Sequence, residues 1–170
     1  MGRTTERSKQ IERFMKKTMF WNIVLSALKL TTGIIGSSFA LISDAINSIS
    51  DIFSSLVGII GIKISGKKAD KEHPYGHEKF EGVFALVLAA VILFTAIELI
   101  RTNVVTLIEY FKNGTALRQP NYIAIVGIAI ALIIKFYIYF STRKMAIKHK
   151  SSILKADALN HFGDIFSTFG

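Results

Sequence analysis

The chain contains long apolar stretches that can cross a lipid bilayer, and these limit its fold more than any other feature. Four of them run over residues 18–36, 39–62, 83–100 and 122–140, and a fifth covers residues 153–170. Crossing the hydrocarbon core as a helix takes about 20 mainly apolar residues. We therefore expect an all-α membrane protein, with a basic N-terminal segment at 1–17 and a transmembrane domain at 18–170.

Composition narrows the protein class further. Hydrophobic residues make up 51% of the 170 residues, against about 45–50% with glycine included in soluble domains, which argues against a disordered chain and a water-soluble enzyme. The absence of cysteine excludes a disulfide scaffold, a cysteine-based zinc site and cysteine nucleophiles. The net charge of +9 is typical of a membrane protein with Lys- and Arg-rich cytoplasmic loops, so we expect no nucleic-acid partner.

Lysine and arginine alternate between high and low numbers along the predicted connections. The N-terminal segment carries six, and the four loops that follow carry none, five, three and five, where the last number includes Lys155 at the start of the fifth stretch. Because cytoplasmic loops are enriched in these residues, we expect a multi-pass plasma-membrane protein with a cytoplasmic N-terminus. Lys29 and Lys135 fall inside predicted spans, and we expect each to reach an interface along its aliphatic stem.

Two of the predicted helices repeat one polar motif. The second reads Asp44-Ala-Ile-Asn47-Ser-Ile-Ser-Asp51-Ile-Phe-Ser54, and the fifth reads Asp157-Ala-Leu-Asn160-His-Phe-Gly-Asp164-Ile-Phe-Ser167, so seven of eleven positions are identical. Positions i, i+3 and i+7 lie within about 60° of one another on a helix. Each helix therefore presents a narrow stripe of carboxylates and amides, and the pair is typical of one site built from two matching helices.

The membrane makes these stripes costly unless they have partners. An Asp at the bilayer centre costs about 2.5–3.5 kcal/mol on insertion scales, so we expect the stripes to face each other, water or a cation. Oxygen ligands suit hard or borderline divalent cations, and four are available, from Asn47, Asp51, Asn160 and Asp164. The alternative is that the stripes only join helices by hydrogen bonds, which Ser and Thr would do at lower cost.

Three further polar residues of the stripes have less certain roles. Asp44 and Asp157 lie nearer one helix end and suit a structural role and an access path equally. His161 follows Asn160 directly, and we expect a packed histidine or a proton carrier ahead of a direct metal ligand.

The second predicted loop collects residue types that bind transition metals. Within eight residues it carries Asp70, His73 and His77, with a proline and a glycine that favour a turn between the histidines. Imidazole suits zinc and other transition metals. A solvated loop without metal is an equally open interpretation. Glu81, at the start of the third span, is expected to orient a ligand or to cap a helix.

Together these motifs resemble the cation diffusion facilitator family. The resemblance rests on residues 43–51, 70–81 and 157–164 and covers nearly the whole chain after the N-terminal segment. It implies six transmembrane helices, then a cytoplasmic metal-sensing domain, usually in a homodimer. This chain would then end within helix five, without helix six or that C-terminal domain. By position the family's intramembrane site maps to Asn47, Asp51, Asn160 and Asp164, and its loop site to Asp70, His73 and His77.

The resemblance implies export of a divalent metal, commonly against entering protons. Asn47 and Asn160 stand where many zinc-exporting relatives have His or Asp, which favours manganese over iron or zinc. We expect metal/proton antiport by alternating access, with the divalent metal ion as the transported substrate and no cofactor. The alternatives are a zinc or iron/cobalt exporter and a non-transporting metal-binding subunit. A membrane hydrolase is disfavoured because no nucleophile motif is evident, so we expect no enzyme.

Overall fold

The computed structural model describes residues 2–113 and 121–169, and every regular element in those ranges is an α-helix. This confirms the all-α prediction. The helices, in chain order, are α1 (Gly2–Ile35), α2 (Phe39–Ser65), α3 (Phe80–Asn113), α4 (Tyr122–His149) and α5 (Ser152–Phe169). Arg118 of the third predicted loop and position 170 of the fifth predicted span lie outside the described residues.

Several helices extend well beyond the apolar stretches that predict them. Residues 2–17 are helical and continuous with the first apolar stretch, because α1 begins at Gly2 and buries Ile11 and Met15 completely. These two side chains are four residues apart and so share one helix face, while Arg13, Lys16 and Lys17 stay at the surface. A search for apolar runs of bilayer length misses this part of α1, because only one side of it is apolar and charged residues interrupt the sequence. That apolar side is enough to pack the start of the helix against its neighbours.

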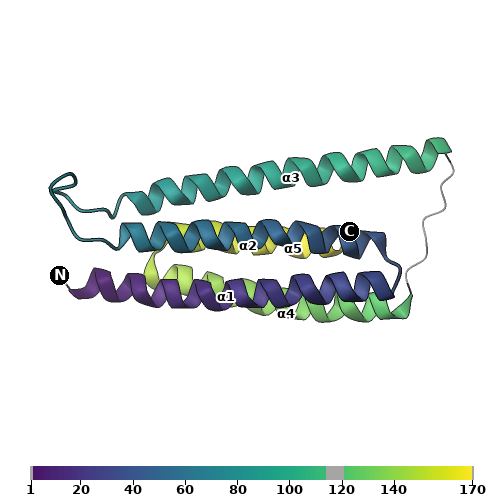
Figure 1. The fold of residues 1–170 in the computed structure, drawn as a ribbon, viewed down its shortest axis with the longest axis horizontal. Helices are drawn as coiled ribbons and strands as arrows, with labels where there is room; N and C mark the ends of the chain where they lie inside the picture. The colour runs from purple at the N-terminus through teal and green to yellow at the C-terminus, as the bar shows by residue number, and fades with distance from the viewer. Residues whose placement is uncertain (1, 114–120, 170) are drawn as a thin grey trace.

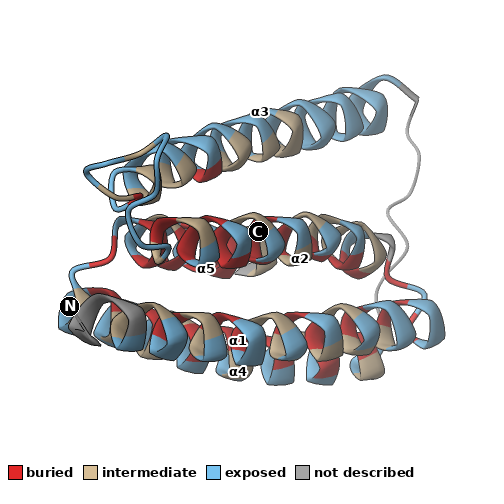
Figure 2. Cartoon of the chain, turned by 60° about the vertical axis from the view of Figure 1, so that its left-hand side comes forward, coloured by how far each residue is buried: buried red, intermediate tan, exposed pale blue. Residues whose placement is uncertain are grey.

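Four of the helices form a bundle, and α3 lies along its outside. Helices α1, α2, α4 and α5 pack against one another, whereas α3 contacts only α2 and α5 substantially (Figure 1). Most of the α3 surface is exposed (Figure 2). The α1–α2 and α4–α5 connections are short and turn at Ser37 and Lys150, both in the left-handed region with φ of 54° and 48°. The two helices joined by each of these connections therefore run in opposite directions.

The core divides into two apolar clusters. The larger joins all five helices and consists of Ile11, Met15, Ile59, Ile62, Leu88, Ala146, Ile153 and Leu154. The smaller joins α1 and α4 through Leu25, Ala131 and Ile138. Nearby, Gly127 lets α1 and α4 approach closely, because a β-carbon there would lie only 2.5 Å from Thr32 Oγ1.

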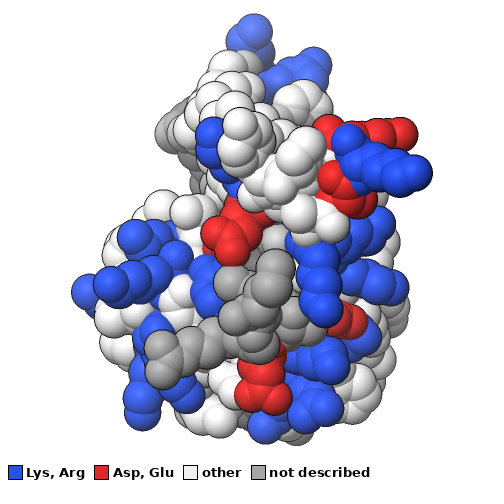
Figure 3. All heavy atoms as spheres, turned by 90° about the vertical axis from the view of Figure 1, so that its left-hand side faces the viewer, with Lys and Arg blue, Asp and Glu red and all other residues white. Residues whose placement is uncertain are grey.

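One end of the bundle gathers most of the basic residues. Here α1, α3 and α5 begin and α2 and α4 end, and we call this the basic end (Figure 1). Figure 3 views it directly and shows Lys and Arg side chains spread over most of the face. The alternation of charge along the sequence thus becomes an asymmetry between the two ends of the molecule.

Among the described residues, four helices are long and apolar enough to cross a membrane. They cover Glu6–Ile35, Ala40–Ser65, Phe80–Lys112 and Tyr122–His149. Helix α5 is not one of them; it is the shortest of the five helices and carries Lys155, Asp157 and Asp164. A membrane crossing by α5 therefore stays a prediction, which its packing against α2, α3 and α4 supports.

Candidate metal sites

The repeated stripes of α2 and α5 meet inside the bundle. Asp51 and Asp164 are both buried, with 4% and 8% of their surface exposed. Asn160 Nδ2 donates a hydrogen bond of 2.8 Å to Asp51 Oδ1, which joins one stripe to the other directly. The stripes come together because each follows the buried face of its helix and the two helices pack against each other. The structure therefore brings three of the four predicted intramembrane ligands into one cluster.

Lys135 of α4 completes this cluster, and its predicted route to an interface is wrong. Its Nζ lies 2.7 Å from Asp51 Oδ2 and 2.7 Å from Asp164 Oδ2, and only 1% of the residue is exposed. Its neighbours on the same helix face, Ala131 and Ile138, are buried as well. Its stem therefore points into the bundle, where two carboxylates offer a better partner than a distant interface.

Asn47, the fourth predicted ligand, lies beside this cluster on the wall of a recess. It is half-buried and lines, with Asn160, Asp164 and Thr95, a recess of about 90 Å³ between α2, α3 and α5. A cavity of this size holds several water molecules. The recess therefore lies next to the carboxylate cluster on its α3 side, and apolar side chains such as Ile92 and Leu99 line the rest of it.

Asp44 belongs to a different buried ion pair. Lys29 Nζ lies 2.7 Å from Asp44 Oδ2, and the lysine side chain is completely buried. Thr168 Oγ1 donates a 3.0 Å hydrogen bond to the same carboxylate oxygen. The predicted route of Lys29 to an interface is therefore also wrong, and the structure favours the structural role for Asp44.

Asp157 and His161 lie on the basic-end side of Asp164 along α5. His161 is completely buried, with Nε2 at 3.5 Å from Asp157 Oδ2 and Nδ1 at 3.7 Å from Asp164 Oδ2. Asp157 is 2% exposed, so it does not line an open path to the surface. The histidine is a packed residue between two carboxylates, and a role as proton carrier stays a prediction.

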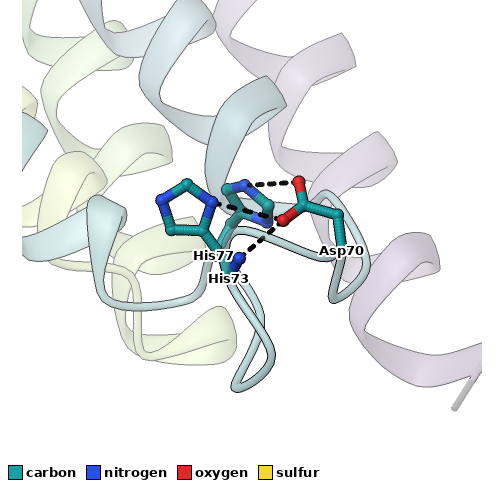
Figure 4. A group of neighbouring side chains, drawn as sticks. All are labelled: Asp70, His73 and His77. Atoms are coloured by element: carbon teal, nitrogen blue, oxygen red, sulfur yellow. Dashed lines mark hydrogen bonds and ion pairs between the residues drawn. The ribbon is translucent and has the colours of Figure 1, made fainter.

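The loop between α2 and α3 brings its three predicted ligands together (Figure 4). One ligand atom from each of Asp70, His73 and His77 lies within 4.8 Å of the others. Asp70 Oδ1 is 3.3 Å from His73 Nδ1, and Asp70 Oδ2 is 3.4 Å from His77 Nε2. Tetrahedral zinc with bonds of about 2.0–2.2 Å separates its ligand atoms by about 3.3–3.6 Å. The donor set therefore suits a transition-metal ion, and ligand atoms within 4.8 Å of one another would have to approach only slightly to reach this spacing.

Local hydrogen bonds prepare the Asp70 carboxylate for this role. The backbone N–H groups of Glu72 and His73 both donate to Asp70 Oδ1, at 3.1 and 2.7 Å. The bond from His73 is the main reason why the pKa of Asp70 lies below its ordinary value. The carboxylate therefore stays ionised, which is the form that binds metal.

Glu81 does cap a helix, but that helix is α5 rather than its own. Its Oε1 accepts a 3.0 Å hydrogen bond from the backbone N–H of Ser152, at the start of α5. The same carboxylate pairs with Arg7 at 2.9 Å, and Arg7 Nε also donates to the carbonyl of His149 at the end of α4. This junction ties α1, α3, α4 and α5 together at the basic end. Sequence spacing gave no sign of these partners, which are 71 to 142 residues apart.

Comparison with known proteins gives a consistent result. The family model described as "Cation efflux transmembrane domain" matches residues 18–170. A Methanocaldococcus jannaschii protein named as an uncharacterized transporter is 33% identical over 162 residues, covering 94% of this chain and 55% of its own length. Magnetosome protein MamM of Paramagnetospirillum magneticum is 34% identical over 143 residues, covering 84% of this chain and 44% of its own. Manganese efflux system protein MneS of Bacillus subtilis is 29% identical over 153 residues, covering 87% and 49%. The chain thus spans about half the length of these curated relatives.

Proposed function

The chain belongs to the cation efflux family of membrane-embedded metal transporters, and from this we propose that it carries a divalent metal ion out of the cytoplasm through the Asp51–Asp164 cluster. The observation that carries the proposal is the meeting of these two carboxylates, from α2 and α5, in the buried centre of a bundle of apolar helices. Buried charges at such a depth are costly and typically mark an ion pathway. The metal is the substrate, and Asn47, Asp51, Asn160 and Asp164 are its ligands.

Manganese is the metal we favour. All four ligand residues offer carboxylate or amide carbonyl oxygens. Such oxygen ligands suit manganese, whereas zinc is also bound well by imidazole and thiolate ligands. The Bacillus subtilis relative named manganese efflux system protein MneS supports the same choice. A zinc or iron/cobalt exporter is the alternative within the family.

Transport coupled to protons follows from the chemistry of the ligands. Carboxylates bind metal in their ionised form, so protons and metal compete for the same oxygens. The protein would alternate between states open to either side, with protons from outside displacing the metal. In this proposal His161, which is buried between Asp157 and Asp164, accepts and releases protons during the exchange.

The loop site and the basic end define the proposed orientation. Lys- and Arg-rich regions face the cytoplasm, so we place the basic end, with Asp70, His73 and His77, on the cytoplasmic side of the plasma membrane. A metal bound in this loop would be a second site, separate from the transport site. Assembly as a homodimer is part of the proposal and rests on the family resemblance.

The test is metal flux in vesicles that contain the protein. Mn²⁺ movement is followed under a pH gradient for the wild type, Asp51→Ala and Asp164→Ala. Glu98→Ala serves as the matched control, because Glu98 is a carboxylate of α3 whose side chain is 45% exposed and whose ion pair is with Arg101 of the same helix. We expect flux to fall at least tenfold in the two variants and to persist in the control. Unchanged flux in both variants would remove these residues from transport, and metal binding without flux in the wild type would identify a non-transporting metal-binding subunit.

A further inference from the structure

The proposed function leaves one buried charge of the transport site without a role, the ammonium group of Lys135. We propose that Lys135 is a tethered counter-cation: its ammonium occupies the place between Asp51 and Asp164 in the metal-free protein, and a divalent ion binds there only by displacing it. This inference rests on the proposed function and adds the residue that sets the affinity of the site.

Geometry places the ammonium and a bridging metal in the same position. Lys135 Nζ lies 2.7 Å from Asp51 Oδ2 and 2.7 Å from Asp164 Oδ2, so these oxygens are at most twice 2.7 Å, or 5.4 Å, apart. A metal with carboxylate bonds of about 2.2 Å would hold two such oxygens within about 4.4 Å. A small approach of the two carboxylates around the ion is therefore sufficient, but only after Nζ has left the space between them.

Burial makes the exchange of one cation for the other obligatory. Lys135 is 1% exposed and its two partners are nearly as buried, so water screens their charges weakly. Two neighbouring carboxylates without a cation would be strongly unfavourable in this environment, and a metal beside the ammonium would be repelled by it. The lysine therefore stabilises the empty site and, by the same interaction, weakens the binding of metal.

The competing interpretation is that Lys135 only holds α2, α4 and α5 together. The two interpretations differ in sign. A structural lysine contributes equally with and without metal, so its loss would weaken metal binding or leave it unchanged. A tethered counter-cation competes with the metal, so its loss tightens binding.

The experiment measures Mn²⁺ affinity by titration calorimetry on the purified full-length protein in lipid nanodiscs. The wild-type reference and every variant carry His77→Ala, so that the loop site contributes to none of the affinities. Lys135→Met keeps the length of the side chain and removes its charge, and we expect Mn²⁺ to bind at least tenfold tighter. Lys29→Met is the matched control, because Lys29 is equally buried but pairs with Asp44, and its Mn²⁺ affinity should stay within about twofold of wild type.

The outcomes separate this inference from the proposed function. If Asp51→Ala binds Mn²⁺ as well as wild type does, the proposed transport site is wrong. If Asp51→Ala loses binding but Lys135→Met binds no tighter than wild type, only the role of Lys135 is overturned. Should Lys135→Met unfold without metal, it is purified with Mn²⁺ and the rate of metal loss to a chelator is measured. Release slower than in wild type supports the proposal, and equal or faster release contradicts it.

Discussion

The buried pair of Lys29 and Asp44 offers a quantitative test of whether Asp44 is a structural residue. The lysine Nζ has one close partner, Asp44 Oδ2 at 2.7 Å, and only long contacts of 3.5 and 3.4 Å to the hydroxyls of Ser48 and Thr168. Asp44 Oδ2 also accepts a 3.0 Å hydrogen bond from Thr168. When its partner is removed, the carboxylate of Asp44 therefore keeps a better hydrogen bond than the ammonium of Lys29 does.

These contacts predict an order of stabilities. Removal of one member of a buried ion pair costs about 3–5 kcal/mol, whereas replacing both by apolar residues is neutral or stabilising by about 1–4 kcal/mol. In Asp44→Leu the ammonium keeps only its long hydroxyl contacts, so we expect a loss near the upper limit, about 5 kcal/mol. In Lys29→Met the carboxylate keeps the hydroxyl of Thr168, so we expect about 3 kcal/mol. The double variant should be about as stable as wild type.

The assay is unfolding of the purified protein in mixed micelles by increasing SDS, followed by circular dichroism, together with metal flux in vesicles. The double variant should recover both the unfolding midpoint and the flux. The reasoning is refuted if the losses in the two single variants simply add in the double variant, because the side chains would then not interact. Normal stability with lost flux in the double variant would instead give Asp44 a direct part in transport.

Three further predictions concern packing, capping and pH. Gly127→Ala should destabilise the bundle by about 1–3 kcal/mol, because the added β-carbon meets the rigid β-carbon of a threonine on α1. Gly58→Ala should cost less, because the added β-carbon there meets the flexible end of a methionine side chain. The melting temperatures of the two variants test this order. Glu81→Ala should cost about 1 kcal/mol by removing the acceptor of the first backbone amide of α5, seen as faster hydrogen exchange at that amide. A backbone N–H lowers the pKa of Asp70 in the folded loop. The ionised carboxylate therefore contributes its full stabilisation of the loop above the unfolded pKa of about 3.9, and this stabilisation is lost as pH falls through the lower pKa of the folded state. Loop amide protection, corrected for intrinsic exchange, should therefore not change between pH 7 and 5, and Asp70→Asn should lower it at both.

The features that could be predicted from the sequence are those with a local period. The spacing of Asn and Asp on α2 and α5 gives each stripe one face, and hydrophobic burial then brings the two faces together. The loop ligands are also local, because Asp70, His73 and His77 fall within a single turn-rich segment. In both cases the distance along the chain already constrains the distance in space.

The lysines show where such reasoning stops. Lys135 lies 84 residues from Asp51, and its contact depends on how α4 is rotated and shifted relative to α2, which no period within either helix specifies. A count of buried charges would have helped. Two apolar stretches carry unpaired Asp residues while two others carry a single Lys each, and opposite charges at membrane depth are expected to find one another.

The junction of Arg7, Glu81 and the start of α5 holds four helices together at the basic end and leaves their opposite ends without this restraint. Because four helix ends meet there, a rigid-body rotation of one helix relative to another would pivot near this junction, and its displacement would grow with distance from it. Helix α3 has 34 residues and is therefore about 51 Å long. Swinging it by about 5° around the fastened end carries its far tip about 4 Å, while the fastened turns hardly shift.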